Sequence, residues 1–535
     1  MKTVLETIRK YLPKAKKQFV AVIVYVLAIT ALEASLTVLM SRIISEAQVR
    51  GTVIFLLLAL GGFLLLLLLD CVLSIGKYRA QDRLGGAFLE AMRTDMFRAV
   101  EKADYQSLIS IGKDKLKHIF YSDVLDVFRI VGNYIGYILL NLILLISFLI
   151  VSAFVNASLA VFLLIAAIVG FAISWFSRRL IMKRSAGVNQ MMKADHNELN
   201  DFVDSIELVK THSLGDYFVE RQKKSLWGFI NASLDADAVM VGLNTLSTNY
   251  YQLIYLGVAA FLSMTVNGND AGSLAFFLFA TQKIISYSSN LESAVYVVMR
   301  MAPAFGNVNK VFETKREDGD TEIGGIDKIE LKNVSFSYNG GDDYVIKNQS
   351  QTFEKGDIVR LSGANGSGKS TYVKLLVNLL KPTEGELLVN GMPAEEIRRD
   401  SLYKHILYIS QDEILLNDSA KNYIEEITGI ELSDGDFSTL LKQVDLPEDL
   451  PDIEMGGKNL SGGQRKKLML INLILRWQGS SVIILDELEN ALDANTREFA
   501  SELLDTIYKD RANHIIFRIS HIDDGTVAVN KQISL

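Results

Sequence analysis

The chain has 535 residues, a hydrophobic fraction of 49% and a formal net charge of −7. The length is sufficient for about two to four domains, and the hydrophobic fraction is high for a soluble protein and typical of a membrane protein. Because the charge is modest and forms no basic stripe, the composition gives no indication of nucleic acid as a partner.

Long apolar runs are confined to residues 16–302, and the remainder is typical of a globular domain. The first run follows a basic N-terminus, as a signal peptide does, but its length and the similar runs after it favour a membrane span. Six runs reach the roughly 20 residues that cross a bilayer. These predicted spans lie near residues 17–40, 52–76, 131–154, 157–177, 239–265 and 272–300.

The distribution of Lys and Arg predicts the orientation of these spans. Both residue types are dense before the first span, between the second and third, and between the fourth and fifth. The short connections near 154–157 and 264–273 carry neither. By the positive-inside rule, we expect a multi-pass protein of the plasma membrane, surrounded by membrane lipids, with both termini in the cytoplasm.

The two internal connections are long, polar and almost free of turn residues, which predicts helices that continue from the membrane into the cytoplasm. We expect short transverse helices near residues 105–112 and 205–214 to join them. Such an arrangement would carry motion out of the membrane.

Cys71 lies inside an apolar run, which favours a buried and inert thiol.

Polar residues make the fifth and sixth predicted spans unusual. Lys283, Tyr287 and Asn290 are spaced so that they share one helix face. Two interpretations remain open. The residues could form contacts between helices, or they could line a wet cavity that admits a substrate.

A change of pattern after Pro303 marks a domain boundary. The charged segment 315–320 is followed by apolar residues in alternation from Ile329 to Phe336, which predicts a strand. We therefore predict a transmembrane domain over residues 1–319 and a second domain over 320–535. The expected fold class is a multi-domain membrane protein, with an all-α six-helix transmembrane domain and an α/β P-loop domain.

A strand at 358–361, a glycine-rich loop at 363–370 and a helix at 371–380 form a P-loop. Backbone N–H groups of such a loop curl around phosphate oxygens, and the helix N-terminus adds its positive end. We expect Lys369 to reach the β- and γ-phosphates of ATP and Ser370 to ligate Mg²⁺. The residues predicted to bind nucleotide here are Gly363, Asn365, Gly366, Ser367, Gly368, Lys369, Ser370 and Thr371.

A second element of the site follows the apolar run 482–485, where two carboxylates end a predicted buried strand. Open α/β sheets bind ligands at the carboxyl ends of their strands. We expect Asp486 to hold Mg²⁺ through water and Glu487 to act as the general base that activates the attacking water.

The segment Leu460–Gln464 resembles the signature motif of ATP-binding cassette (ABC) ATPases. Other segments match that family in order. Tyr338 resembles the aromatic residue that stacks on adenine, Gln411 the Q-loop glutamine, Asp493 the aspartate of the D-loop, and His521 the switch histidine. The family's signature positions correspond here to Ser461, Gly462, Gly463 and Gln464.

The resemblance implies a dimer with two composite sites, in which each ATP lies between one P-loop and the partner's signature motif. Ser461 and Gly463 would donate to the γ-phosphate bound by the other subunit. His521 would hold the γ-phosphate in catalysis. Gln411 would ligate the metal, take part in catalysis and report the nucleotide to the membrane helices. Met455, where many family members have glutamate, is a departure from the pattern.

A six-helix domain ahead of the cassette is similar to the exporter subclass, which implies ATP-driven export by alternating access. The partner would be a second copy of the chain or a related half-transporter. An ATP-gated regulator or channel is the alternative outside transport. Peptide cargo is the first expectation, because the fifth and sixth spans are polar and rich in tyrosine. Drugs and lipids or glycolipids are the alternatives.

Overall fold

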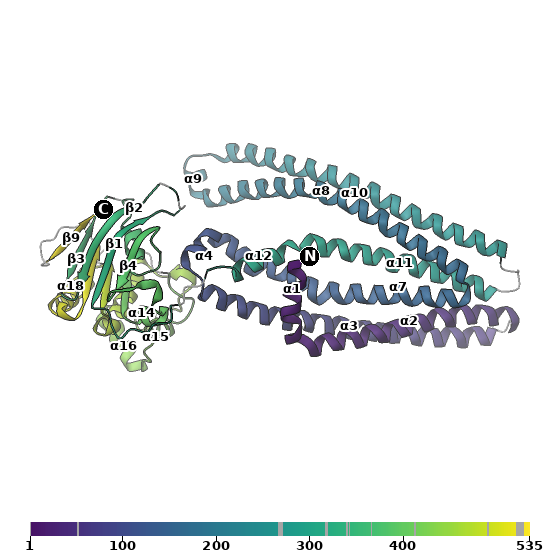
Figure 1. The fold of residues 1–535 in the computed structure, drawn as a ribbon, viewed down its shortest axis with the longest axis horizontal. Coiled ribbons are helices and arrows are strands. Elements are labelled where there is room, and N and C mark those ends of the chain that lie inside the picture. The colour runs from purple at the N-terminus through teal and green to yellow at the C-terminus, as the bar shows by residue number, and fades with distance from the viewer. Residues whose placement is uncertain are drawn as a thin grey trace. The chain divides into compact units, whose positions relative to one another are not determined.

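The computed structural model describes residues 2–50, 53–265, 271–315, 319–338, 341, 343–364, 366–410, 414–488, 492–519 and 529–535. These residues divide into two compact units (Figure 1). The first unit comprises Met1–Ala99 and Asp114–Glu313, and the second comprises Val100–Lys113 and Thr314–Leu535.

The first unit is helical. Its long helices lengthen well beyond the predicted spans because few turn-forming residues interrupt them. The helical elements that begin before residue 313 are α1 (Lys2–Tyr11), η1 (Leu12–Ala15), α2 (Lys16–Arg50), α3 (Val53–Glu101), α4 (Tyr105–Ile111), α5 (Lys113–His118), η2 (Ile119–Asp123), α6 (Val124–Arg129), η3 (Ile130–Tyr134), α7 (Ile135–Val155), α8 (Ala157–Asp204), α9 (Ile206–Thr211), α10 (Gly215–Thr265), α11 (Ala271–Met301) and α12 (Pro303–Phe312).

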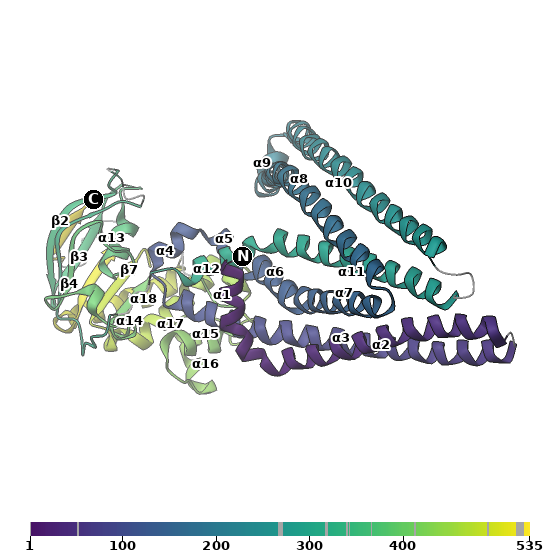
Figure 2. The same ribbon diagram turned by 45° about the vertical axis from the view of Figure 1, so that its right-hand side comes forward.

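Two sets of helices pack together within this unit. Helix α10 runs along α8, and the short α9 joins them, as both ribbon views show (Figure 2). Helix α11 packs against α2, α7 and α8. At the start of the unit, the ring of Tyr11 is fully buried and lies edge-on to the ring of Phe88, with their centroids 5.4 Å apart.

Within the described residues, four helical segments are long and apolar enough to cross a membrane. They are Val4–Glu46, Val53–Glu101, Lys113–Phe154 and Ala157–Ile181. The predicted fifth and sixth spans lie in the long helices α10 and α11, which are not among the four. Polar residues such as Gln252 and Asn290 lower the mean hydropathy of these two helices.

The structure corrects one sequence expectation about the membrane helices and bears on one question that the sequence left open. Cys71 was expected to be buried, but it is exposed on α3, because the most apolar stretch of that helix has no buried residue within one chain. For Tyr287 and Asn290, the contacts favour the first of the two open interpretations, contact between helices. Tyr287 is buried against Phe148, and Asn290 Nδ2 donates to Asn141 Oδ1 at 3.1 Å, so both make contacts between helices.

The second unit is built on two sheets. One is antiparallel with the strand order β2-β1-β4-β5, and the other is parallel with the order β6-β7-β8-β3-β9. Alternating apolar residues form β1 as expected. The strands are β1 (Lys328–Phe336), β2 (Ile346–Glu354), β3 (Ile358–Ser362), β4 (Glu384–Val389), β5 (Met392–Pro393), β6 (Ile406–Ile409), β7 (Val482–Asp486), β8 (Ile515–Ile519) and β9 (Lys531–Ser534).

Helices cover these sheets and complete two apolar cores. They are α13 (Lys369–Leu376), α14 (Arg399–Lys404), α15 (Ala420–Thr428), α16 (Asp434–Gln443), α17 (Gly462–Arg476) and α18 (Ala494–Lys509), with short helical turns η4 (Ala394–Glu396), η5 (Met455–Gly457), η6 (Trp477–Gly479) and η7 (Arg511–Asn513). Together with the first unit, this arrangement confirms the predicted fold class, a helical transmembrane region fused to an α/β P-loop domain.

The segment 100–113 belongs to the second unit although it lies between two membrane spans in the sequence. Its contacts explain this placement. Arg399 Nη1 donates to the carbonyl of Glu101 at 2.7 Å, and the backbone N–H of Asp104 donates to the carbonyl of Lys315 at 2.8 Å. Tyr105, the first residue of α4, packs against an apolar core of the unit.

Parallel pairing places the carboxyl ends of β3, β7 and β8 at the same edge of the sheet. All five residues of β7 and all five of β8 are buried, as is typical of strands covered on both faces. The P-loop therefore leaves β3 beside the carboxylates that follow β7.

Candidate functional site

The P-loop connects β3 to α13 through backbone conformations that glycine adopts readily. Gly368 has φ +100°, and a Cβ atom there would lie 3.0 Å from Val345 Cγ1. Gly363 is also closely surrounded, since an added Cβ would lie 2.5 Å from Ser367 Oγ. A side chain at Gly363 or Gly368 would therefore collide with neighbouring atoms.

Lys369 begins α13 and bends back over the loop. Its Nζ donates to the carbonyls of Gly363 and Ala364 at 2.8 and 3.0 Å. The ammonium group of Lys369 therefore lies against the P-loop, which directly precedes this residue in the sequence. Ser367 Oγ is buried and has no hydrogen-bond partner among the described residues, which leaves one polar atom of the loop available to a ligand.

The carboxylates at the end of β7 differ in their backbone. Asp486 is the last residue of the strand and is buried. Glu487 has φ +50°, which is rare for a residue with a long side chain. Its N–H donates to the carbonyl of Ile519 at 3.1 Å, and its carbonyl accepts from Lys466 Nζ at 3.3 Å. These bonds hold a strained residue in place, and such strain is concentrated at functional sites.

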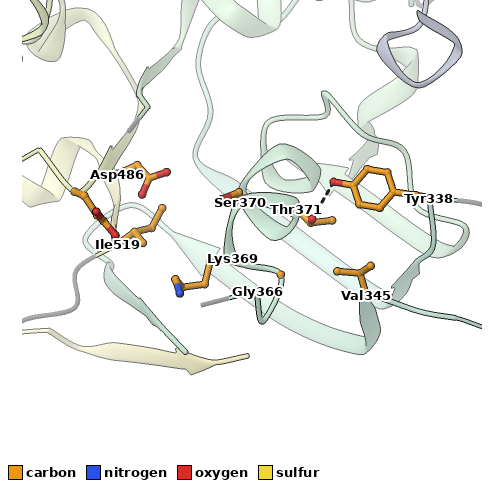
Figure 3. A pocket seen from close by; sticks show the side chains of 10 residues that line it. Tyr338, Val345, Gly366, Lys369, Ser370, Thr371, Asp486 and Ile519 are labelled. Atoms are coloured by element: carbon orange, nitrogen blue, oxygen red, sulfur yellow. Dashed lines mark hydrogen bonds between the residues drawn. The ribbon is translucent and has the colours of Figure 1, made fainter. Parts of the chain in front are cut away.

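A cavity of about 700 Å³ joins these parts. Figure 3 shows side chains of the P-loop helix and of the strand ends that point toward one space. The cavity is large enough for a nucleotide, since ligand pockets have volumes of about 300–1,000 Å³. The residues that line it are Tyr338, Val345, Gly366, Gly368, Lys369, Ser370, Thr371, Asp486, Glu487 and Ile519.

Tyr338 forms one wall of the cavity. Its hydroxyl and Thr371 Oγ1 are 3.0 Å apart, and its ring meets that of Phe336 edge-on, with 4.9 Å between the centroids (Figure 3). The residue is 44% exposed. It therefore presents an aromatic surface that a flat ligand such as adenine can cover.

The signature residues lie elsewhere in the unit. Ser461 caps α17, since its Oγ accepts from the N–H of Gln464 at 3.1 Å and its own N–H donates to Gln464 Oε1 at 2.8 Å. This reciprocal capping box satisfies two donors at the helix N-terminus. Ser461 and Gly462 are exposed, and neither they nor Gly463 and Gln464 line the cavity.

Asp493 also lies outside the cavity lining. It caps α18 by accepting from the N–H of Thr496 at 2.9 Å, and it pairs with Lys467 Nζ at 2.6 Å. The hydrogen bond from Lys467 and then that from Thr496 hold the pKa of Asp493 well below its usual range. Lys467 also donates to the carbonyl of Asp445 at 2.9 Å. It therefore connects the helix after the signature to the start of α18.

The structure brings together most of the P-loop residues, Tyr338 and both carboxylates, as the sequence predicted for a single site. Asn365, Gln411 and His521 lie outside the described residues. Sequence reasoning missed Val345 and Ile519 in the lining. It also missed Lys466 and Lys467, for which the signal was a run of three basic residues, Arg465 to Lys467, directly before an apolar stretch of the same helix.

The residues of the site fit a magnesium nucleotide. The orphaned Ser367 Oγ and the glycine cradle suit phosphate oxygens. The hydroxyl of Ser370 and the carboxylate of Asp486 provide oxygen ligands of the kind that Mg²⁺ prefers. A P-loop followed by a buried strand that ends in carboxylates defines a P-loop nucleotide-binding domain, here fused to a helical membrane region.

Comparisons with known proteins identify the class more closely. Residues 346–490 match the family model described as ABC transporter. Residues 19–287, about half of the chain, match the model of the ABC transporter transmembrane region. The chain therefore belongs to the ABC transporter family.

The relatives agree with this assignment. A protein named as a multidrug export ATP-binding/permease protein of Staphylococcus aureus is 27% identical over 379 residues, which cover 66% of this chain and 64% of that protein. The heterocyst differentiation ATP-binding protein HepA of a Nostoc species is 25% identical over 335 residues, covering 60% of this chain and 54% of that protein. The match thus spans less than two thirds of the length of each relative.

A solved structure of a bacterial Atm1-family ABC exporter with ATP bound has the same fold. It superimposes with a TM-score of 0.81 at 16% sequence identity, covering 97% of this chain and 93% of that chain. At this identity the similarity concerns the fold.

Proposed function

We propose that this chain is one half of an ATP-driven exporter, which hydrolyses ATP at two composite sites of a dimer and exports its cargo by alternating access. One observation carries the proposal. The cavity of the P-loop includes both carboxylates, whereas the exposed Ser461 lies outside it. A second signature motif, from a partner, is needed to cover the γ-phosphate. The partner is a second copy of the chain or a related half-transporter.

The residues of one chain divide the chemistry among them. When nucleotide binds, the ammonium of Lys369 gives up its hydrogen bonds to the carbonyls of Gly363 and Ala364 and donates to phosphate oxygens instead. Ser370 and Asp486 hold Mg²⁺, which when bound neutralises charge that develops on the phosphates. Glu487 accepts a proton from the attacking water as the water oxygen bonds to the γ-phosphorus and the bond to the oxygen of ADP breaks.

We further propose residues for the parts of the site that the structure does not describe. Asn365 completes the phosphate loop, Gln411 ligates the metal, and His521 contacts the γ-phosphate. We also propose that both termini and the ATPase domain lie in the cytoplasm, because Lys and Arg are concentrated in the connections predicted to be internal.

A peptide is the first candidate for the cargo, because α10 and α11 carry polar and tyrosine side chains in the membrane region. An amphipathic drug is the second candidate, because the name of the Staphylococcus aureus relative refers to multidrug export. Uptake into inverted vesicles separates them when a labelled cationic peptide and a labelled lipophilic amine are offered under the same conditions.

The experiment for the core of the proposal is Glu487→Gln. The substitution keeps the size of the side chain but removes the base, so the full-length protein should bind ATP normally and hydrolyse it about 10²–10⁴-fold more slowly. Glu498→Gln, on the exposed face of α18, is the matched control and should hydrolyse at the wild-type rate. Near-normal hydrolysis by Glu487→Gln would show that the base is a different residue.

A further inference from the structure

A second cavity lies within the helical unit, between α2, α3 and α11. Its volume is about 390 Å³. Each helix contributes residues spaced three, four or seven apart, which is one face of a helix. The lining residues are Glu33, Leu36, Thr37 and Met40 from α2, Phe63, Leu67 and Asp70 from α3, and Phe279, Gln282, Lys283 and Ser286 from α11.

The charges of this cavity do not balance. Lys283 Nζ lies 2.7 Å from Glu33 Oε2, and this ion pair accounts for one carboxylate. Asp70 Oδ1 is buried and has no hydrogen-bond partner among the described residues. The lining thus contains two carboxylates and one ammonium. Lys77 lies two turns further along α3, and it is not part of the lining.

Both carboxylates lie at the same depth. Glu33 is 18 residues before residue 51, and Asp70 is 18 residues after residue 52. Since α2 and α3 run in opposite directions from the connection between them, the two positions are level, roughly 27 Å from that connection at 1.5 Å per residue. The two helices approach closely at one point, since a Cβ added to Gly76 would lie 2.5 Å from the ring of Tyr25.

An unpaired carboxylate is unfavourable within a membrane, where ionisable residues pair with one another or mark a site of function. The ion pair with Lys283 satisfies Glu33. Asp70 feels the charges of Lys283 and Lys77, but its Oδ1 has no hydrogen-bond partner among the described residues. Around it, Phe63, Leu67 and Phe279 provide apolar and aromatic surface. Aromatic faces attract cations as well as apolar groups.

We propose that this cavity binds the protonated amino group of an amphipathic ligand, with Asp70 as its counter-ion and the aromatic side chains in contact with the ligand's apolar part. The inference rests on the proposed export function, because it makes the cavity a binding site for cargo. The ammonium can belong to a small lipophilic amine or to a cationic peptide. In both cases the ammonium would form an ion pair with the carboxylate of Asp70.

Binding of monodansylcadaverine, a fluorescent primary amine, to the purified full-length protein in nanodiscs tests the proposal without ATP. Asp70→Asn removes the charge and should weaken binding about tenfold or more, because a hydrogen bond between charged partners is lost. Asp235→Asn, on the exposed surface of α10, is the matched control and should bind as the wild type does. The N-acetylated probe lacks the charge and should bind both proteins equally weakly.

Lys283→Met provides an independent arm. It removes the ammonium that competes for the carboxylates, so the affinity for monodansylcadaverine should increase. A cationic amphipathic peptide, titrated in competition with the probe, identifies the source of the ammonium. Displacement that depends on Asp70 assigns the site to peptides as well, and its absence restricts the site to small amines.

Equal binding of the amine by wild type and Asp70→Asn would overturn the proposal, as would equal binding of the acetylated probe and the amine by the wild type. An unchanged helical circular dichroism spectrum and an unchanged melting temperature show that Asp70→Asn is folded. Because probe binding requires no hydrolysis, this result is separate from those of Glu487→Gln, which tests ATP hydrolysis, and of vesicle uptake, which tests export.

Discussion

The conformation of Gly368 leads to a quantitative prediction for nucleotide binding. A residue with a side chain at φ +100° costs roughly 1–2 kcal/mol. In Gly368→Ala, the new Cβ would lie 3.0 Å from Val345 Cγ1 and 3.1 Å from Ile346 Cδ1. Moving these neighbours adds roughly 1 kcal/mol. The substitution therefore costs roughly 2–3 kcal/mol in the conformation that presents the loop to phosphate.

The free loop can relieve this strain by changing its conformation, but the bound loop cannot. The cost therefore falls on binding and should weaken affinity roughly 30- to 150-fold. Titration of the full-length protein with a fluorescent ATP analogue measures it. Gly435→Ala in α16 is the matched control, because the nearest atom to its Cβ would be Ser433 Oγ at 3.9 Å. If Gly368→Ala bound nucleotide within about twofold of wild type, the strain argument would be refuted.

Three further predictions concern local stability. Lys467→Met should destabilise the start of α18 by about 2 kcal/mol, measured as faster amide hydrogen exchange. Lys442→Met is the control and should not change the exchange rate, because the ion pair of Lys442 is exposed. Equal exchange in the two variants would show that Lys467 does not hold α18 to α17. The pKa of Asp493 is lower in the folded protein than in the unfolded chain. Its ionised carboxylate therefore stabilises the fold fully above the unfolded pKa of about 4. This stabilisation is lost only as the pH falls through the lower, folded pKa. Protection of the first turn of α18 should thus be constant from about pH 7 to 5, and loss of protection in that range would contradict this assignment. Gly76→Val should lower the thermal stability of the protein, because a Cβ at this position meets the ring of Tyr25; an unchanged melting temperature would show that the helices separate at little cost.

The nucleotide site was largely predictable because its parts are local in sequence. The spacing of glycines before Lys369 specifies a phosphate loop, and an apolar run that ends in Asp486 and Glu487 specifies the end of a buried strand. Parallel pairing then places both at one edge of the sheet. By contrast, no pattern indicated Val345 or Ile519, which reach the cavity only through the packing of neighbouring strands.

The polar residues of α11 show the limit of periodicity. Lys283, Tyr287 and Asn290 share one face by spacing, and the sequence left open whether that face is wet. In the structure, Asn290 bonds to Asn141 on α7, whereas Lys283 pairs with Glu33 on α2. One helix face meets several neighbouring helices along its length, so spacing within a helix cannot assign the partner of each residue.

The sequence by itself determined the class of this protein, because long apolar runs require a membrane and the P-loop and signature motifs require particular residues at fixed spacings. Only the tertiary structure decided where the charges of the membrane region lie. It paired Glu33 with Lys283 across 250 positions and left Asp70 in the same cavity without a bond to Oδ1. Contacts between distant helices depend on three-dimensional packing, and no local pattern of residues encodes them.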